Sequence, residues 1–293
     1  MSTATTAAPR PSGTARPRSW RARGGRWGVH GVLLAYSLIA LGPTLLIVAN
    51  SFKSRRAIFD NAFSLPTAET FDLVGYETVF SGSSFDLYFR NSFIVTAVSV
   101  LLVVAFASMA AFALTEYEFK GNALLSVYLV MGVMIPIRLG TVSILKLMVS
   151  LGLVNTLWAL ILVYTAMGLP LGVFLMSQFM RQVPKELKSA ARVDGASEYR
   201  VLGLVMPLVR PGMAAVAVFT MLPVWNDLWF PLILAPDEQT RTVTLGASAF
   251  LGQFERNWNA LLAALTLAMV PILLLYVVFS RQFLRGLTEG AIK

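Results

Sequence analysis

The sequence predicts an all-α integral membrane protein with six transmembrane helices and a cytoplasmic helix–turn–helix loop. Of its 293 residues, 56% are hydrophobic and only 13% are charged, whereas a soluble domain carries roughly 25% charged residues. Six stretches are also long and apolar enough to cross a bilayer, which takes about 20 residues of helix. In water such a chain would have too little polar surface, so we expect it to lie in lipid.

The predicted spans follow a basic N-terminal stretch. Residues 1–27 are rich in Arg, Pro, Ser and Gly, a composition that predicts a disordered cytoplasmic tail. Residues 28–293 then form the transmembrane domain. Its first span lies too far from the N-terminus for an ordinary signal peptide, so we expect it to be retained. The six predicted spans are residues 29–50, 92–114, 122–145, 157–180, 213–235 and 260–280.

The basic residues predict the orientation. Six spans place both termini on one side, and sixteen of the 24 Lys and Arg residues then lie on that side. The side richer in Lys and Arg is the cytoplasm. The net charge of +9 is therefore explained by the tail and the loops, which favours membrane lipid over nucleic acid as the partner. We expect a multi-pass protein with both termini in the cytoplasm.

Prolines and glycines within the spans predict bends and close helix packing. Proline removes a backbone hydrogen bond and kinks or breaks a helix. The prolines concerned are Pro43, Pro136, Pro170, Pro223, Pro231 and Pro271. Gly168 and Gly172 form a small-xxx-small pair, which is typical of closely packed membrane helices.

Several classes of chemistry are excluded by composition. The chain has no cysteine and a single histidine, His30, so we expect no metal site and no histidine-based catalytic cluster. It also lacks the Gly-rich Lys-Ser/Thr loop that binds nucleotide phosphates. We therefore expect that the chain is not itself an enzyme and binds no cofactor.

Residues 181–212 carry the strongest functional signal. Pro184 suits a first helical position, and residues 185–193 read as a short helix. Asp194 and Gly195 predict a stop, with the glycine in the left-handed conformation. Ser197 can cap a second short helix. The sequence therefore predicts a helix–turn–helix at the membrane face.

The surface of this loop has two interpretations. Ala190 and Ala191 leave a smooth patch that another protein could approach closely. The basic residues around it could meet an acidic rim on that partner; they are Lys185, Lys188, Arg192 and Arg200. An amphipathic helix resting on lipid head groups explains the composition equally well.

The loop resembles a known family. The segment Ser189-Ala-Ala-Arg-Val-Asp194-Gly195-Ala196, followed by Met206-Pro207, is similar to the EAA loop of bacterial ABC importer permeases. In that family the loop forms a coupling helix that inserts into a cleft of the cytoplasmic ATPase. Ser189 replaces the family's leading glutamate, and Glu186 lies one turn earlier. The resemblance implies an ATPase-coupling site made of Glu186, Ser189, Ala190, Ala191, Asp194, Gly195 and Ala196.

Further matches extend the resemblance over roughly residues 28–293. Asn50-Ser-Phe-Lys53, Tyr88-Phe-Arg-Asn91 and Trp225-Asn226-Asp227 are similar to carbohydrate-type permeases. The ending Gly286-Leu-Thr-Glu-Gly-Ala-Ile-Lys293 resembles that of the maltose-transporter permease whose tail lies between the two ATPases. This resemblance implies a tail that contacts the ATPase through Thr288, Glu289, Gly290 and Lys293.

The resemblance also implies the assembly and the function. The chain would form half of a translocation path for a sugar or related solute in the bacterial inner membrane. Its partners would be a second related permease, two ATPase subunits that bind ATP and magnesium, and an extracytoplasmic solute-binding protein. A secondary transporter or a channel is the alternative. Secondary transporters usually carry internal repeats, and we find none here.

The fifth predicted span holds the candidate contacts to the solute. An ionisable group inside a span is costly and marks a functional site by default, which singles out Asp227. Asn226 lies beside it, and Trp225 and Trp229 supply aromatic faces that suit a sugar. The structural interpretation is that Asn226 and Asp227 bond to backbone groups freed near Pro223.

Overall fold

The structure is a computed structural model that describes residues 20–81, 84–252 and 257–291. Over that part the chain is helical, and its one β contact is an isolated bridge between Lys53 and Phe71. The predicted all-α fold is therefore confirmed. The chain divides into two compact units, residues 1–46 and 47–293.

The first unit holds most of helix α1 (Trp20–Ser51). Within α1, Val29–Ser51 is long and apolar enough to cross a membrane. Pro43 lies inside the helix and does not end it. The helix begins at Trp20, inside the stretch predicted to be a disordered tail, and residues 1–19 of that prediction lie outside the described residues.

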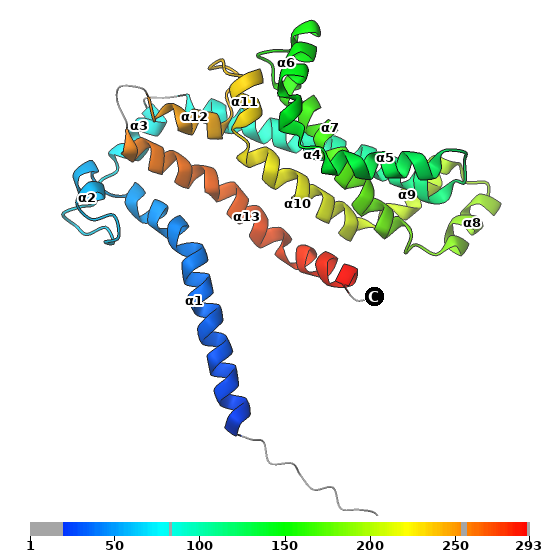
Figure 1. The fold of residues 1–293 in the computed structure, drawn as a ribbon, viewed down its shortest axis with the longest axis horizontal. Helices are drawn as coiled ribbons and strands as arrows, with labels where there is room; N and C mark the ends of the chain where they lie inside the picture. Colours follow the sequence, from blue (N-terminus) through cyan, green and yellow to red (C-terminus); the bar gives the residue numbers. More distant parts are fainter. Residues whose placement is uncertain (1–19, 82–83, 253–256, 292–293) are drawn as a thin grey trace, which may run out of the picture. The chain divides into compact units, whose positions relative to one another are not determined.

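The second unit contains the remaining helices (Figure 1). In chain order they are α2 (Arg55–Asp60), α3 (Val74–Ser81), α4 (Phe85–Glu116), α5 (Asn122–Met134), the 3-10 helix η1 (Ile137–Gly140), α6 (Thr141–Ser150), α7 (Leu157–Met180), α8 (Lys185–Val193), α9 (Glu198–Val205), α10 (Arg210–Asn226), α11 (Trp229–Leu234), α12 (Val243–Ala249) and α13 (Trp258–Ala291).

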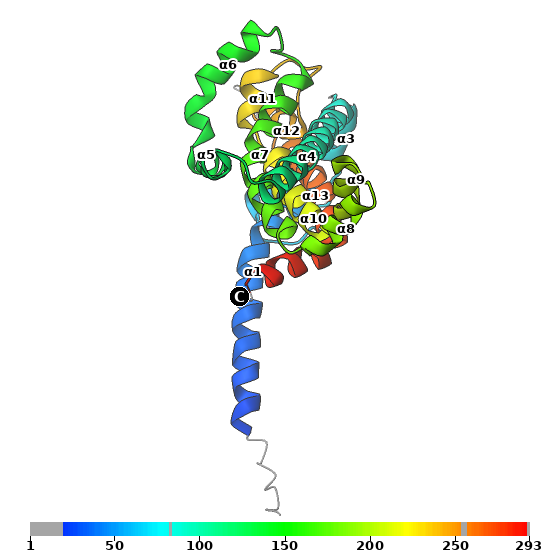
Figure 2. The same cartoon turned by 90° about the vertical axis from the view of Figure 1, so that its right-hand side faces the viewer.

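Helices α4, α7 and α10 pack side by side at the centre of this unit (Figures 1 and 2). A Cβ atom added at Gly168 would lie 2.7 Å from Val103, and one at Gly172 would lie 3.0 Å from Ala107. Both distances are shorter than an ordinary contact between carbon atoms. The two glycines of α7 therefore let α4 approach closely, as the small-xxx-small pattern predicts.

Three described helices are long and apolar enough to span a membrane singly: Val29–Ser51, α4 and α7. Two bent helix pairs raise the number to five if each pair is one span; they are α5 with residues 137–150, and α9 with α10. The sixth predicted span lies in α13, whose segment Trp258–Leu274 is a shorter apolar helix within the described side chains. Each predicted span thus overlaps one or more helices.

Two of the predicted spans are not single helices. The predicted span 122–145 ends at Met134, and the chain turns by 88° before it continues at Ile137. The predicted span 213–235 ends at Asn226 and resumes as α11. Pro136 stands at the first break. Proline alone does not explain these breaks, because α7 and α10 continue past Pro170 and Pro223.

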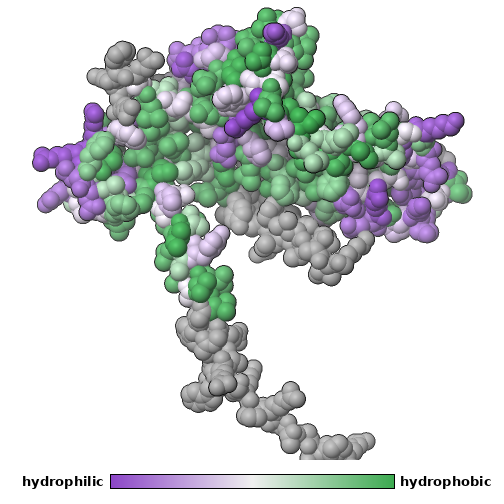
Figure 3. Space-filling view, viewed as in Figure 1, coloured by the Kyte–Doolittle hydropathy of each residue, from purple (hydrophilic) through white to green (hydrophobic). Residues whose placement is uncertain are grey.

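The surface of the second unit has a hydrophobic band (Figure 3). Hydrophilic residues gather around α2 at one end of the unit and around α8 at the other, and hydrophobic residues dominate between them. Helices α4 and α5 carry exposed apolar and aromatic side chains, among them Leu101, Phe106 and Tyr128. Such a surface suits lipid.

Candidate functional site

Helices α8 and α9 form the predicted helix–turn–helix. Gly195 has a φ of +78°, the left-handed conformation that glycine adopts without a steric penalty. Its N–H donates to Arg192 O, and the N–H of Ala196 donates to Ala191 O at 2.9 Å. This pair of bonds is a Schellman motif, which satisfies carbonyls at the end of α8. Ser197 precedes α9 at its N-cap, although its side chain makes no capping bond.

One side of this unit is buried against the ends of the spans. Ala191 packs in a core cluster with Val201 and Val205 of α9 and with Phe112 of α4. The sequence analysis placed Ala191 on the free patch with Ala190, but only Ala190 is exposed. Consecutive helical residues lie about 100° apart, so two neighbouring alanines cannot both face the same way.

The other side is free within the described chain. Glu186, Ser189, Asp194 and Gly195 are exposed, and Ala196 is half-buried. Two apolar side chains that the sequence analysis did not single out project furthest: Val193 is 87% exposed and Tyr199 is 81% exposed. Exposed apolar side chains on a polar loop are compatible with a contact to another protein or to lipid.

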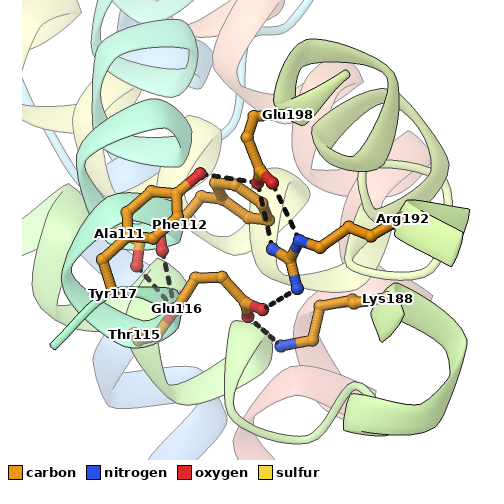
Figure 4. Close-up of polar contacts among 8 residues, drawn as sticks. All are labelled: Ala111, Phe112, Thr115, Glu116, Tyr117, Lys188, Arg192 and Glu198. Carbon is orange, nitrogen blue, oxygen red and sulfur yellow. Dashed lines mark hydrogen bonds and ion pairs between the residues drawn. The ribbon is translucent and has the colours of Figure 1, made fainter. Parts of the chain in front are cut away.

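Four charged side chains join this unit to the end of α4 (Figure 4). The Lys188 ammonium pairs with the Glu116 carboxylate, and their side chains are only 6% and 10% exposed. Arg192 Nη1 lies 2.7 Å from Glu116 Oε1, while its Nε lies 2.8 Å from Glu198 Oε1. The hydroxyl of Tyr117 donates to Glu198 Oε2 at 2.6 Å. We call these five residues the α4–α8 network.

This network corrects one expectation. Lys188 and Arg192 were expected to meet an acidic rim on a partner, but they bond inward to acids of their own chain. Two hydrogen-bonded carboxylates raise the pKa of Arg192, the bond to Glu198 having the larger effect. Burial, and next the bond to Glu198, raise the pKa of Tyr117 to about 12. At neutral pH both donors therefore keep their protons.

Removing one member of a buried pair leaves an uncompensated charge, which costs about 3–5 kcal/mol. Glu116 accepts from both Lys188 and Arg192. Substitution of Glu116 is therefore expected to destabilise the contact between α4 and α8 more than substitution of either partner. The network therefore fixes α8 and α9 against α4, although Glu116 and Lys188 are 72 residues apart in sequence.

A cavity of about 430 Å³ lies between α7 and α10, with Arg138 of η1 at its edge. Its walls are mainly apolar and aromatic. The polar and charged residues among them are Arg138, Tyr164, Thr220, Asn226 and Asp227. Apolar walls with a few convergent polar groups are typical of small-molecule sites.

Asp227 is held by several donors. Its Oδ2 accepts from the Tyr164 hydroxyl at 2.9 Å and from the N–H of Phe230 at 3.1 Å. Its Oδ1 accepts from the N–H of Trp229 at 3.2 Å and lies 3.9 Å from Arg138 Nη2. The carboxylate thus bonds to backbone groups freed at the start of α11, as the structural interpretation expected, and also faces the cavity.

The other three residues of the predicted solute contact lie in different surroundings. Asn226 lines the cavity, and its amide donates to Leu222 O of its own helix. Trp229 is partly exposed, and the Arg138 guanidinium lies 5.8 Å from its ring centroid. Trp225 instead turns into the core, where its Nε1 donates to Ala268 O at 3.0 Å. Arg138, which the sequence analysis did not assign to this site, is brought in by the bend after α5.

The predicted ATPase-contacting tail lies at the limit of the structure. The backbone of α13 includes Thr288, Glu289 and Gly290, but their side chains lie outside the described ones. Lys293 lies outside the described residues altogether.

Comparison with known proteins gives a consistent set of relatives. Residues 103–289 match the family described as "Binding-protein-dependent transport system inner membrane component". The diacetylchitobiose uptake system permease protein of Streptomyces coelicolor is 34% identical over 267 residues, covering 90% of this chain and 88% of that protein. The arabinooligosaccharides transport system permease protein of Halalkalibacterium halodurans is 34% identical over 261 residues, covering 88% and 92%.

The fold is also found in a solved structure. A bacterial ABC transporter involved in the import of the acidic polysaccharide alginate contains a chain that superposes with a TM-score of 0.76. The match covers 92% of this chain and 100% of that one, at 21% sequence identity. At this identity the match establishes the arrangement of the helices alone.

Proposed function

We propose that this chain, which belongs to the family of binding-protein-dependent transport system inner membrane components, imports an oligosaccharide. It is a permease subunit of an ABC importer, because its full-length relatives are permease proteins of sugar uptake systems. Membership of this family sets aside the alternatives of a secondary transporter and a channel. The chain lies in the bacterial inner membrane, with both termini in the cytoplasm.

The observation that carries the proposal is the exposed face of α8 and α9. Glu186, Ser189, Ala190 and Gly195 are free there, beside the projecting Val193. A small, flat surface with an apolar projection suits insertion into a cleft of another protein. We propose that this cleft belongs to a cytoplasmic ATPase, which binds the ATP and magnesium.

The assembly follows from this arrangement. Two ATPase subunits would lie below this chain and a second related permease, with an extracytoplasmic solute-binding protein above them. The tail residues Thr288, Glu289, Gly290 and Lys293 are a second proposed ATPase contact. This chain would supply half of the translocation path and no catalytic residue.

Copurification from native membranes tests the proposal. The solubilised native chain is expected to recover an ATPase and a second permease. Ala190→Arg, which places a long charged side chain on the exposed face, is expected to lose the ATPase. Glu69→Arg introduces the same side chain at an exposed position far from α8, and it should behave like the native chain. Recovery of the ATPase with Ala190→Arg, or of no ATPase with the native chain, would contradict the proposal.

We propose that the solute passes the cavity beside Arg138, Asn226 and Asp227. Guanidinium, carboxamide and carboxylate groups match sugar hydroxyls, and the ring of Trp229 can stack on a sugar face. Asn226→Ala is the clean test, because among the described residues the Asn226 amide bonds to Leu222 O of its own helix. Loss of a hydrogen bond worth roughly 0.5–1.5 kcal/mol should raise the KM of uptake about 2- to 13-fold.

The matched control is Gln178→Ala, which removes a side-chain amide from an exposed position in the last turn of α7, outside the lining of this cavity. An unchanged KM for Asn226→Ala would exclude Asn226 from the path. The relatives suggest the solutes to test, since their names specify diacetylchitobiose and arabinooligosaccharides. Competition of each oligosaccharide against labelled uptake in proteoliposomes would identify the class.

A further inference from the structure

Helix α4 differs from the other long helices in its composition. Its 32 residues contain neither proline nor glycine, whereas α1, α7, α10 and α13 each contain both. Sharp kinks occur almost always at proline, at glycine or at a helix irregularity. At 1.5 Å per residue, α4 is a rod of roughly 48 Å, long enough to reach from one face of a bilayer to the other.

The cytoplasmic end of this rod is fixed to α8 and α9. Glu116, the last residue of α4, accepts from Lys188 and Arg192 of α8, and Tyr117 donates to Glu198 of α9. The sequence neighbours of the loop are α7 and α10, but these charged contacts reach α4 instead. A displacement of α8 is therefore transmitted to α4 as well as to its own neighbours.

The opposite end is fixed to the segment 236–244, which leads into α12 and includes its first two residues. Asn91 is buried, and its amide donates to Gln239 O at 2.9 Å and to Arg241 O at 3.0 Å. The Ser92 hydroxyl accepts from the N–H of Val243 at 2.8 Å. The tip of this segment is exposed, so it is free to respond to a partner outside the membrane.

The same segment is connected to the cavity. The hydroxyl of Thr244 donates to Asp227 O at 2.7 Å, and the Asp227 side chain lines the cavity. One long helix without proline or glycine therefore joins the α8–α9 unit, whose exposed face is proposed to bind the ATPase, to a segment that bonds to Asp227 of the proposed solute path.

We propose that α4 is a rigid strut that carries movement between the α8–α9 unit and segment 236–244, and that Glu116 and Asn91 are the positioning residues at its two ends. The inference rests on the proposed function, and it adds the route by which the two faces communicate. Packed elements with satisfied contacts at both ends move as units, because cores and interfaces are bistable and do not deform continuously.

The test uses the full complex with its ATPase and solute-binding protein in proteoliposomes. The readouts are the stimulation of ATP hydrolysis by the loaded binding protein and the solute imported per ATP. Glu116→Gln is expected to lower both by about fivefold or more, the lower end of usual coupling between sites. Glu118→Gln removes the same charge from an exposed position two residues later, and it should match the native chain.

Two further variants separate coupling from folding. Glu116→Met combined with Lys188→Met removes both buried charges, so it should fold and assemble while remaining uncoupled. Asn91→Ala should uncouple the other end. Combined with Glu116→Gln, it should be no worse than the worse single variant, because both changes interrupt one serial link.

Three results would overturn the strut: Glu116→Gln remaining within about twofold of Glu118→Gln, restored coupling in the double methionine variant, or losses that multiply when the two ends are combined. A native complex that recovers no ATPase would overturn the proposed function itself. The two failures are therefore distinguishable.

Discussion

Substitutions at Gly195 change the backbone preference of the α8–α9 turn without adding a steric clash. The residue has a φ of +78°, and a Cβ atom added there would meet nothing within 4 Å. A substitution is therefore not opposed by packing, and only the backbone conformation changes its stability. The informative pair is Gly195→Ala and Gly195→Asn, since asparagine adopts the left-handed conformation far more readily than alanine.

The magnitude follows from this geometry. A left-handed residue with a Cβ costs roughly 1–2 kcal/mol, so Gly195→Ala should weaken the closed turn by about this amount. The turn is held by the N–H groups of Gly195 and Ala196, which bond to Arg192 O and Ala191 O at 3.0 and 2.9 Å. Opening exposes both amides. Their hydrogen exchange should accelerate by about 5- to 30-fold in the alanine variant.

The assay is hydrogen exchange of the solubilised chain, read at peptides that cover residues 190–200. Gly195→Asn should exchange at a rate between those of the native chain and the alanine variant. Amides of α4 should not change in either variant, because the α4–α8 network is untouched. Equal exchange in all three chains, or faster exchange with asparagine than with alanine, would refute the argument from backbone conformation.

Two other predictions concern the packing and the cavity. Gly172→Leu should lower the free energy of unfolding by about 1–3 kcal/mol through overpacking against α4. Gly203→Ala should be neutral or slightly stabilising, because a Cβ atom there meets nothing within 4 Å. Equal thermal midpoints for the two variants would contradict the close approach of α4 and α7. Tyr164→Phe should cost about 1.5–3 kcal/mol by removing one hydrogen bond to a charged group, and Asp227→Ala should cost more, because it strands that hydroxyl and two backbone N–H groups. The reverse order in thermal unfolding would show that Asp227 does not hold the start of α11.

Local signals in the sequence were sufficient for much of the fold. Apolar runs of about 20 residues predicted where helices lie, and Asp194-Gly195 predicted a left-handed turn that the structure confirms. Each of these features depends on the residues of one segment and on the solvent around it. The sequence-based prediction was therefore reliable where no distant partner takes part.

The break in the third predicted span was not predictable in this way. Pro136 stands at the break, but Pro43, Pro170 and Pro223 lie inside helices that continue. A proline removes one backbone bond wherever it occurs. Whether the helix then ends depends on the neighbours that accept the freed carbonyl, and these come from the packing of other helices.

In the candidate site, too, some residues were predictable from the local sequence and others are placed by packing. Asn226 and Asp227 were identified from the cost of polar groups within a span, and both line the cavity. Trp225 and Trp229 are equally aromatic in sequence, but Trp225 is in the core, whereas Trp229 is exposed and lies against Arg138. Arg138 joins the site only because the chain turns by 88° after α5.

The sequence by itself thus determined that this is a helical membrane protein, where its helices lie, and which loop turns at a glycine. It also carried the resemblance to a permease family, because that resemblance resides in contiguous residues. Only the tertiary structure decided the direction in which charges on the loop point. Lys188 and Arg192 could have paired with a partner, and it is the approach of Glu116 from 72 and 76 residues away that pairs them internally. The free energy of a charge depends on its surroundings, and packing creates those surroundings.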